Sequence, residues 1–74
     1  MIREAPEVRQ DIGKRIALIR RQMTNKTQES LALDIGMSAS YLCQLEAGKR
    51  NPTVDRLVRI SAALKVDVGE FFKT

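Results

Sequence analysis

The chain of 74 residues has one cysteine, Cys43, and contains no histidine. A lone cysteine cannot form a disulfide within the chain, and a structural zinc site needs several Cys or His ligands. So short a domain is usually stabilised by disulfides, a metal or oligomerisation, and oligomerisation is the one that remains. A single thiol is also typical of a reducing compartment, so we expect a cytoplasmic protein without metal or cofactor.

Long hydrophobic runs are also missing. No apolar stretch approaches the roughly 20 residues that a membrane-spanning helix needs, so no membrane partner is expected. Residues 1–6 include Arg3 and Glu4 and precede no apolar segment, which argues against a signal peptide. Because the chain also lacks a cysteine–base arrangement and a glycine-rich phosphate loop, we expect that it is not an enzyme.

The charge balance is modestly basic, with 13 Lys and Arg against 9 Asp and Glu and a net charge of +4. Such an excess permits an anionic partner without requiring one. The basic residues crowd residues 9–26, where Asp11 alone is acidic. They are Arg9, Lys14, Arg15, Arg20, Arg21 and Lys26. A solvated helix face explains this cluster equally well, so charge alone does not identify the partner.

Apolar residues recur at helical spacing throughout, and no alternating run or hairpin turn indicates a strand. Five short helices are predicted: about residues 8–22, then after Thr27, after Ser38 to about Ala47, after Thr53, and between Asp67 and Phe72. Thr27, Ser38 and Thr53 are good N-caps, and Gly36 suits a left-handed C-terminal cap. The prediction is an all-α, compact five-helix bundle, with residues 1–7 as a flexible N-terminal segment and residues 8–74 as one domain.

The second and third predicted helices are short and joined by about three residues, Gly36–Ser38, which matches a helix-turn-helix. That geometry alone is weak evidence, because many helical hairpins share it. The residues are more specific: Thr27-Gln28 opens the second helix, and the run from Leu45-Glu46-Ala47-Gly48 to Asn51-Pro52 ends the third. On these residues the chain resembles the Cro/CI-type (XRE) family of phage and bacterial repressors, over about residues 12–72.

The resemblance implies a lambda-repressor-like domain that binds double-stranded DNA. Within the family the chain is most similar to the stand-alone controller proteins of restriction–modification systems, which are dimeric regulators of their own gene and the endonuclease gene. It thus implies a homodimeric transcription regulator on a palindromic operator, with no small-molecule effector. The alternative is an antitoxin or other protein-interaction module that uses the same fold.

The resemblance also implies a structural ion pair. In the family, an arginine near the end of the first helix pairs with the glutamate of the Leu-Glu-x-Gly run, which is Glu46 here. The connection to the second helix, residues 21–26, is about one residue longer than is usual in the family. Arg20 is the preferred partner of Glu46, and Arg21 is the alternative. A partly buried pair of this kind is costly to break from one side.

The predicted third helix has two distinct sides at about 100° per residue. Leu42, Leu45 and Glu46 fall on the inner side. The opposite side carries small residues and one amide, namely Ala39, Ser40, Cys43, Gln44 and Ala47. An ordinary exposed helix face usually carries Lys and Glu instead, so this composition favours close approach to base edges.

Gln44 is the best candidate for reading a base, because its amide can pair with adenine N6 and N7. Ser40 can bond to most bases, whereas Ala39 can contact only a thymine methyl group. Tyr41 lies at the border of the two sides. Its ring either packs with the hydroxyl facing water, or its hydroxyl reaches a phosphate or base edge. Cys43 faces the groove, and we assign it no redox role.

Phosphate contacts are expected on both sides of this helix. By resemblance, Gln28 grips a phosphate at the start of the second helix, where backbone N–H groups and Thr27 assist. Ser38, at the start of the third helix, belongs to the same predicted DNA-binding set. The loop residues Lys49, Arg50 and Asn51 are placed to contact phosphates, which fix register without reading sequence. The alternative for this loop is simple solvation.

The C-terminal end is the predicted dimer interface. Phe71 and Phe72 are adjacent and point about 100° apart, so one ring can enter the core while the other stays outside. The resemblance implies that Phe71 is core and that Val68 and Phe72 lie at a two-fold axis. The alternative is that both rings pack within one monomer. Two copies related by such an axis read half-sites roughly 34 Å apart.

Overall fold

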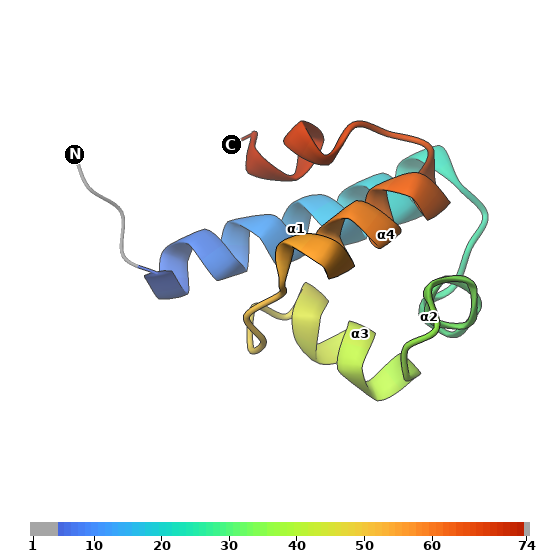
Figure 1. Ribbon diagram of the computed structural model, residues 1–74, viewed down its shortest axis with the longest axis horizontal. Coiled ribbons are helices and arrows are strands. Elements are labelled where there is room, and N and C mark those ends of the chain that lie inside the picture. Colours follow the sequence, from blue (N-terminus) through green and yellow to red (C-terminus); the bar gives the residue numbers. More distant parts are fainter. Residues whose placement is uncertain (1–4, 74) are drawn as a thin grey trace.

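The computed structural model describes residues 5–73, and this part of the chain is all-α without a strand. Four α-helices are followed by a terminal 3-10 helix (Figure 1). They are α1 (Ala5–Met23), α2 (Gln28–Ile35), α3 (Ala39–Glu46), α4 (Val54–Leu64) and η1 (Val68–Phe72). α1 runs along the length of the molecule, with α2 and α3 on one side of it and η1 on the other.

The first helix begins earlier than predicted. Residues 5–7, assigned above to a flexible N-terminal segment, form the first turn of α1. Pro6 is compatible with this position because the N–H groups of a first turn have no acceptor within the helix. Glu7 places a carboxylate at the positive end of the helix dipole, which favours the same start. Residues 1–4 of the predicted segment lie outside the described residues.

The prediction of a fifth α-helix is wrong, because the last element is the 3-10 helix η1. The carboxylate of Asp67 accepts a hydrogen bond from the Gly69 N–H at 2.9 Å, one residue before the position that a capping box requires. Glu70 instead contacts Arg15 of α1 and Lys73. Five residues that include a glycine hold the tighter i→i+3 turn more readily than an α-helix.

Three threonine and serine side chains begin the inner helices, as predicted. The hydroxyl of Thr27 accepts from the Ser30 N–H at 3.1 Å, and that of Ser38 accepts from the Tyr41 N–H at 3.0 Å. Thr53 caps α4 in the same way. Each of these bonds satisfies a backbone donor that has no partner inside the helix, which fixes where the helix starts.

Glycines end both helices of the helix-turn-helix. Gly36 has φ 69° and Gly48 has φ 78°, a left-handed conformation that glycine adopts without steric cost. The N–H after each glycine bonds back into the helix, from Met37 to the Ala32 carbonyl and from Lys49 to the Gln44 carbonyl, both at 2.9 Å. These bonds form Schellman caps. The second cap turns the following loop back over the end of α3.

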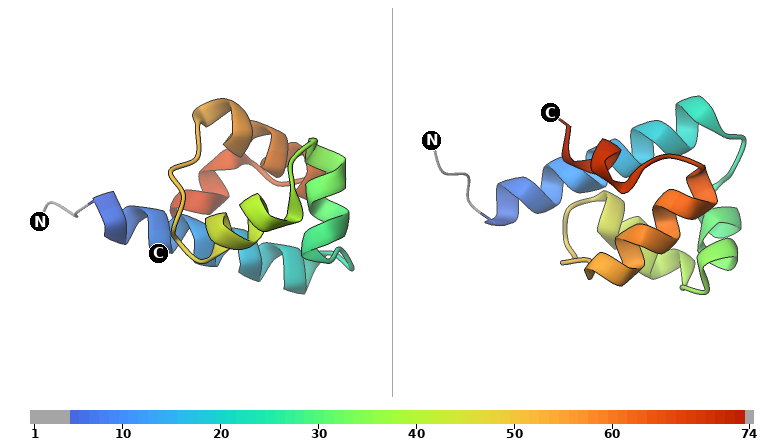
Figure 2. Two further views of the ribbon diagram at one scale, coloured as in Figure 1. Left: turned by 90° about the horizontal axis from the view of Figure 1, so that it is seen from below. Right: turned by 45° about the horizontal axis from the view of Figure 1, so that its top comes forward.

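The core takes residues from every element. It consists of Ile12, Ile16, Ile19, Leu31, Ala32, Ile35, Leu42, Leu45, Leu57, Ile60, Leu64 and Phe71. Phe71 is fully buried, so it anchors η1 against α1, and the views in Figure 2 show η1 alongside the first half of that helix. The inner side predicted for the third helix is confirmed, because Leu42, Leu45 and Glu46 are all buried.

Gly13 lies where α1 passes against the end of α3, and it was not among the residues predicted to matter. A Cβ atom at this residue would lie 2.4 Å from the carbonyl oxygen of Leu45 and 2.7 Å from that of Glu46. Both distances are far below van der Waals contact, and both neighbours are backbone atoms. Glycine therefore sets how closely α3 approaches α1.

We expect Gly13→Ala to lower the free energy of unfolding by about 1–3 kcal/mol, as overpacking does in well-packed cores. Helix propensity acts in the opposite direction, because alanine in a helix interior is favoured over glycine by about 1 kcal/mol. Urea unfolding followed by circular dichroism measures the difference. The control is Lys14→Ala at the neighbouring exposed position, with an expected change within about 0.5 kcal/mol. A Gly13→Ala variant that is more stable than the parent chain contradicts the close approach.

Candidate nucleic-acid interface

A buried ion pair joins α1 to the end of α3. Arg20 donates two parallel hydrogen bonds to Glu46, Nε to Oε2 at 2.8 Å and Nη2 to Oε1 at 2.9 Å. The two residues are 7% and 8% exposed, whereas Arg21 is exposed to solvent. Arg20 is thus the partner of Glu46. The hydrogen bonds that Arg20 donates to Glu46 raise the pKa of Arg20 above its ordinary value, so the guanidinium stays charged despite its burial.

The same pair organises the start of α2. Arg20 Nη1 donates to the carbonyl oxygen of Lys26 at 3.1 Å, which holds the loop before α2. Gln28 Nε2 donates to Glu46 Oε1 at 2.9 Å. Gln28, predicted to grip a phosphate, therefore uses one N–H within the protein and keeps its second N–H for another acceptor. These bonds link α1, α2 and α3 at one point and fix α3 relative to the α2 N-terminus.

The outer side of α3 is small and uncharged, as predicted. Ser38, Ser40, Cys43 and Ala47 are exposed, and Gln44 is half-buried. Ala39, predicted to face DNA, packs partly against the core, so only part of its surface remains outside. In Figure 1, α2 is seen along its axis while α3 runs across the view, so the two helices cross steeply. Because most of its residues are exposed, the outer side of α3 is open to solvent.

Tyr41 does not show the first of its two predicted arrangements, in which the hydroxyl faces water. Its ring packs partly against the core, but its hydroxyl is buried and has no hydrogen-bond partner within residues 5–73. The ring lies beside two guanidinium groups, with the Cζ of Arg56 4.8 Å and that of Arg50 5.7 Å from its centroid. Cations at such distances are attracted to the face of an aromatic ring. The Tyr41 hydroxyl is therefore shielded from solvent in the free protein.

Arg50 is also more constrained than a solvated loop residue. Its Nε donates to Gln44 Oε1 at 2.7 Å, so its side chain folds back over α3. Lys49 and Asn51, its neighbours in the predicted phosphate-contacting loop, are exposed. Arg56 joins this cluster from the first turn of α4 and was not among the predicted residues. No local pattern in the sequence signals that contact.

The predicted dimer residues differ in exposure. Phe72 is 55% exposed, whereas Val68 is half-buried and packs against the core. Phe72 shares an apolar hollow of about 370 Å³ with Val8, Pro52 and Val54, and Val54 is 74% exposed. The exposed apolar surface at this end of the molecule therefore extends from η1 to the start of α4.

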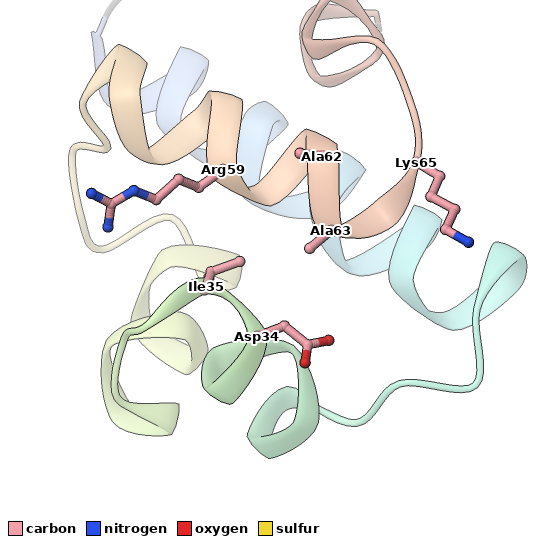
Figure 3. Close-up of a pocket in the computed structure, with 6 residues that line it drawn as sticks. All are labelled: Asp34, Ile35, Arg59, Ala62, Ala63 and Lys65. Carbon is pink, nitrogen blue, oxygen red and sulfur yellow. The ribbon is translucent and has the colours of Figure 1, made fainter.

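A second hollow, of about 620 Å³, lies between α2 and α4 (Figure 3). Arg59 and Lys65 project at its two ends, and Asp34, on its α2 side, forms an ion pair with Lys26. None of its lining residues belongs to α3 or to the loop after α3. It is separate from the candidate interface. Within residues 5–73, no helix combines the length and apolar character needed to cross a membrane.

The model of the helix-turn-helix family matches residues 18–71, which contain α2, α3 and α4. The chain therefore belongs to the XRE-type helix-turn-helix family. This result confirms the family resemblance drawn from Thr27 to Pro52.

Within this family, the chain is similar to control proteins of comparable length. Control protein C.MunI of a Mycoplasma species is 35% identical over 60 residues, which span 81% of each chain. Control protein C.BamHI of Bacillus amyloliquefaciens is 35% identical over 54 residues, 73% of this chain and 67% of that protein. The crystal structure of the restriction–modification controller protein C.AhdI from Aeromonas hydrophila matches with a TM-score of 0.87 at 26% identity, over 95% of this chain and 100% of that one.

Proposed function

We propose that this protein is a transcription regulator that binds double-stranded DNA in a sequence-specific manner. It acts as a homodimer on a palindromic operator and controls a restriction–modification operon that includes its own gene. The observation that carries the proposal is the outer side of α3, which is small, uncharged and exposed. It lies between two groups of residues to which we assign phosphate contacts, at the start of α2 and in the loop after α3. The similarity to control proteins supports the choice of operon.

In this proposal α3 enters the major groove and α2 lies across the phosphate backbone. Gln44 and Ser40 contact base edges, with Ala39 and Cys43 beside them. Phosphates are bound by the α2 N-terminus with Thr27 and Gln28, by Ser38, and by the loop residues Lys49, Arg50 and Asn51. The Thr27 hydroxyl accepts the Ser30 N–H and keeps its own O–H to donate to a phosphate.

The homodimer is held by the exposed ring of Phe72, with Val68 beside it. Phe72→Asp places a charge in an apolar interface, and we expect it to raise the dimer dissociation constant by roughly 30- to 1000-fold, the effect of losing an aromatic hot spot. Sedimentation equilibrium measures this change. Leu33→Asp is the matched control, because Leu33 is 81% exposed on α2, away from this surface. Equal effects of the two substitutions contradict the assigned interface.

Gln44→Ala tests the assigned base contact. On a duplex enriched by repeated selection from random DNA, we expect the variant to bind roughly 5- to 150-fold more weakly, because one base contact is lost. On random duplexes the loss should stay within about two-fold, because that binding rests on phosphates. Gel-shift titrations measure both affinities. Equal losses on both kinds of DNA contradict base reading by Gln44, and a parent chain that forms no specific complex indicates a protein-interaction module instead.

A further inference from the structure

Four side chains form a continuous row from the outer side of α3 to the start of α4. Gln44 Oε1 accepts the hydrogen bond from Arg50 Nε at 2.7 Å. The guanidinium of Arg50 lies 5.7 Å from the ring centroid of Tyr41, and that of Arg56 lies 4.8 Å from the same centroid. Tyr41 and Gln44 are three residues apart on α3 and so share one face of the helix. Arg50 spans both of them.

The backbone holds Arg50 in this position. Gly48 takes the left-handed conformation at φ 78°, and the Lys49 N–H bonds to the Gln44 carbonyl at 2.9 Å. The loop therefore returns to the same turn of α3 that carries the Gln44 side chain. The Tyr41 ring supports the guanidinium by a cation–π contact. In the free protein, the amide oxygen of Gln44 is thus turned toward Arg50 at an exposed position.

This hydrogen bond changes what Gln44 offers to a base. Pairing with adenine requires the amide oxygen to accept from N6 while the amide nitrogen donates to N7. The oxygen is already an acceptor for Arg50. It has a second lone pair, but an adenine amino group that approached it would bring its hydrogens against a positively charged guanidinium. The groups left toward the groove are donors, from the amide of Gln44 and from Arg50.

We propose that Arg50 sets the base specificity of Gln44, so that the pair selects guanine instead of adenine. Guanine presents two acceptors in the major groove, N7 and O6, which match an edge made of donors. Arg50 is then a specificity-determining residue and not only a phosphate contact, and Tyr41 is a positioning residue that acts through it. The inference rests on the proposed function, because it requires α3 to face base edges.

The test compares the parent chain with Arg50→Met. This substitution keeps an unbranched side chain of similar length and removes the N–H donors of the guanidinium. The operator position read by Gln44 is the one at which Gln44→Ala loses base preference. At this position, duplexes that differ only by guanine or adenine are titrated by fluorescence anisotropy. We expect the parent chain to prefer guanine by roughly 5- to 100-fold. Arg50→Met should lose this preference or favour adenine, because the amide oxygen is released.

Lys49→Met is the matched control, since it removes one positive charge from the same loop. It should weaken binding to both duplexes by the same factor and leave the base preference intact, as expected of a phosphate contact. If the parent chain prefers adenine, or if Arg50→Met weakens both duplexes equally as Lys49→Met does, the inference is overturned while sequence-specific binding stands. If the parent chain discriminates at no operator position, the proposed function itself fails.

Discussion

Glu46→Ala is expected to lower the free energy of unfolding by about 3–5 kcal/mol, because it leaves the buried guanidinium of Arg20 without its charged partner. The substitution also removes the acceptor of Gln28 and so loosens the start of α2. Small domains are stable by only about 5–15 kcal/mol in total, and one of this size lies toward the lower end. The variant should therefore be substantially unfolded near 37 °C, as measured by urea and thermal unfolding.

Two controls show whether the loss of stability comes from an unpaired buried charge or from the loss of any ion pair. Asp34→Ala breaks the exposed pair with Lys26 and should cost about 1 kcal/mol or less. The double variant Arg20→Leu/Glu46→Leu leaves no unpaired charge and should recover most of the stability lost in Glu46→Ala. A Glu46→Ala variant no less stable than Asp34→Ala contradicts the structural role assigned to the pair.

The second large effect concerns salt. If a dimer neutralises about eight phosphates, the logarithm of the association constant should fall with the logarithm of the salt concentration at a slope near −7. Affinity for operator DNA should then drop by roughly 10⁴-fold between about 50 and 200 mM salt. Lys49→Ala, which removes one expected phosphate contact per protomer, should make the slope shallower by about 2. A slope near zero contradicts the assignment of phosphate contacts to α2 and to the loop after α3.

Much of the fold was predictable because its signals are local. Thr27, Ser38 and Thr53 cap helices through bonds to residues three positions ahead, and a left-handed turn at Gly36 is a property of glycine itself. The buried stripes follow the helical period and need no tertiary information. The predicted start of the first helix, at about residue 8, lies three residues after the observed start, because the first turn of α1 includes Pro6. The 3-10 geometry of η1 was not predicted, because five residues at helical spacing fit an α-helical turn and the tighter i→i+3 turn equally well.

The candidate site was only partly predictable, because part of it depends on contacts between elements that are distant in the sequence. The two sides of α3 follow from periodicity, and the Glu46 partner followed from family resemblance, although the long connection left Arg20 and Arg21 open. The row from Gln44 through Arg50 and Tyr41 to Arg56 depends on a loop folding back and on α4 lying beside it. Gly13 likewise matters only because α3 approaches α1 at that residue. Contacts between elements of this kind have no local signature.

Selection of binding sites by the purified protein from a library of random duplexes tests the central claim most directly. The account predicts an enriched sequence with two-fold symmetry, whose half-sites lie about one helical turn apart, roughly 10 bp or 34 Å. Two-fold symmetry of the enriched sequence would indicate that the protein binds as a homodimer. Enrichment itself would indicate that α3 reads bases. Enrichment of a single unsymmetrical half-site contradicts the dimer, and failure to enrich any sequence contradicts the proposal that α3 reads DNA.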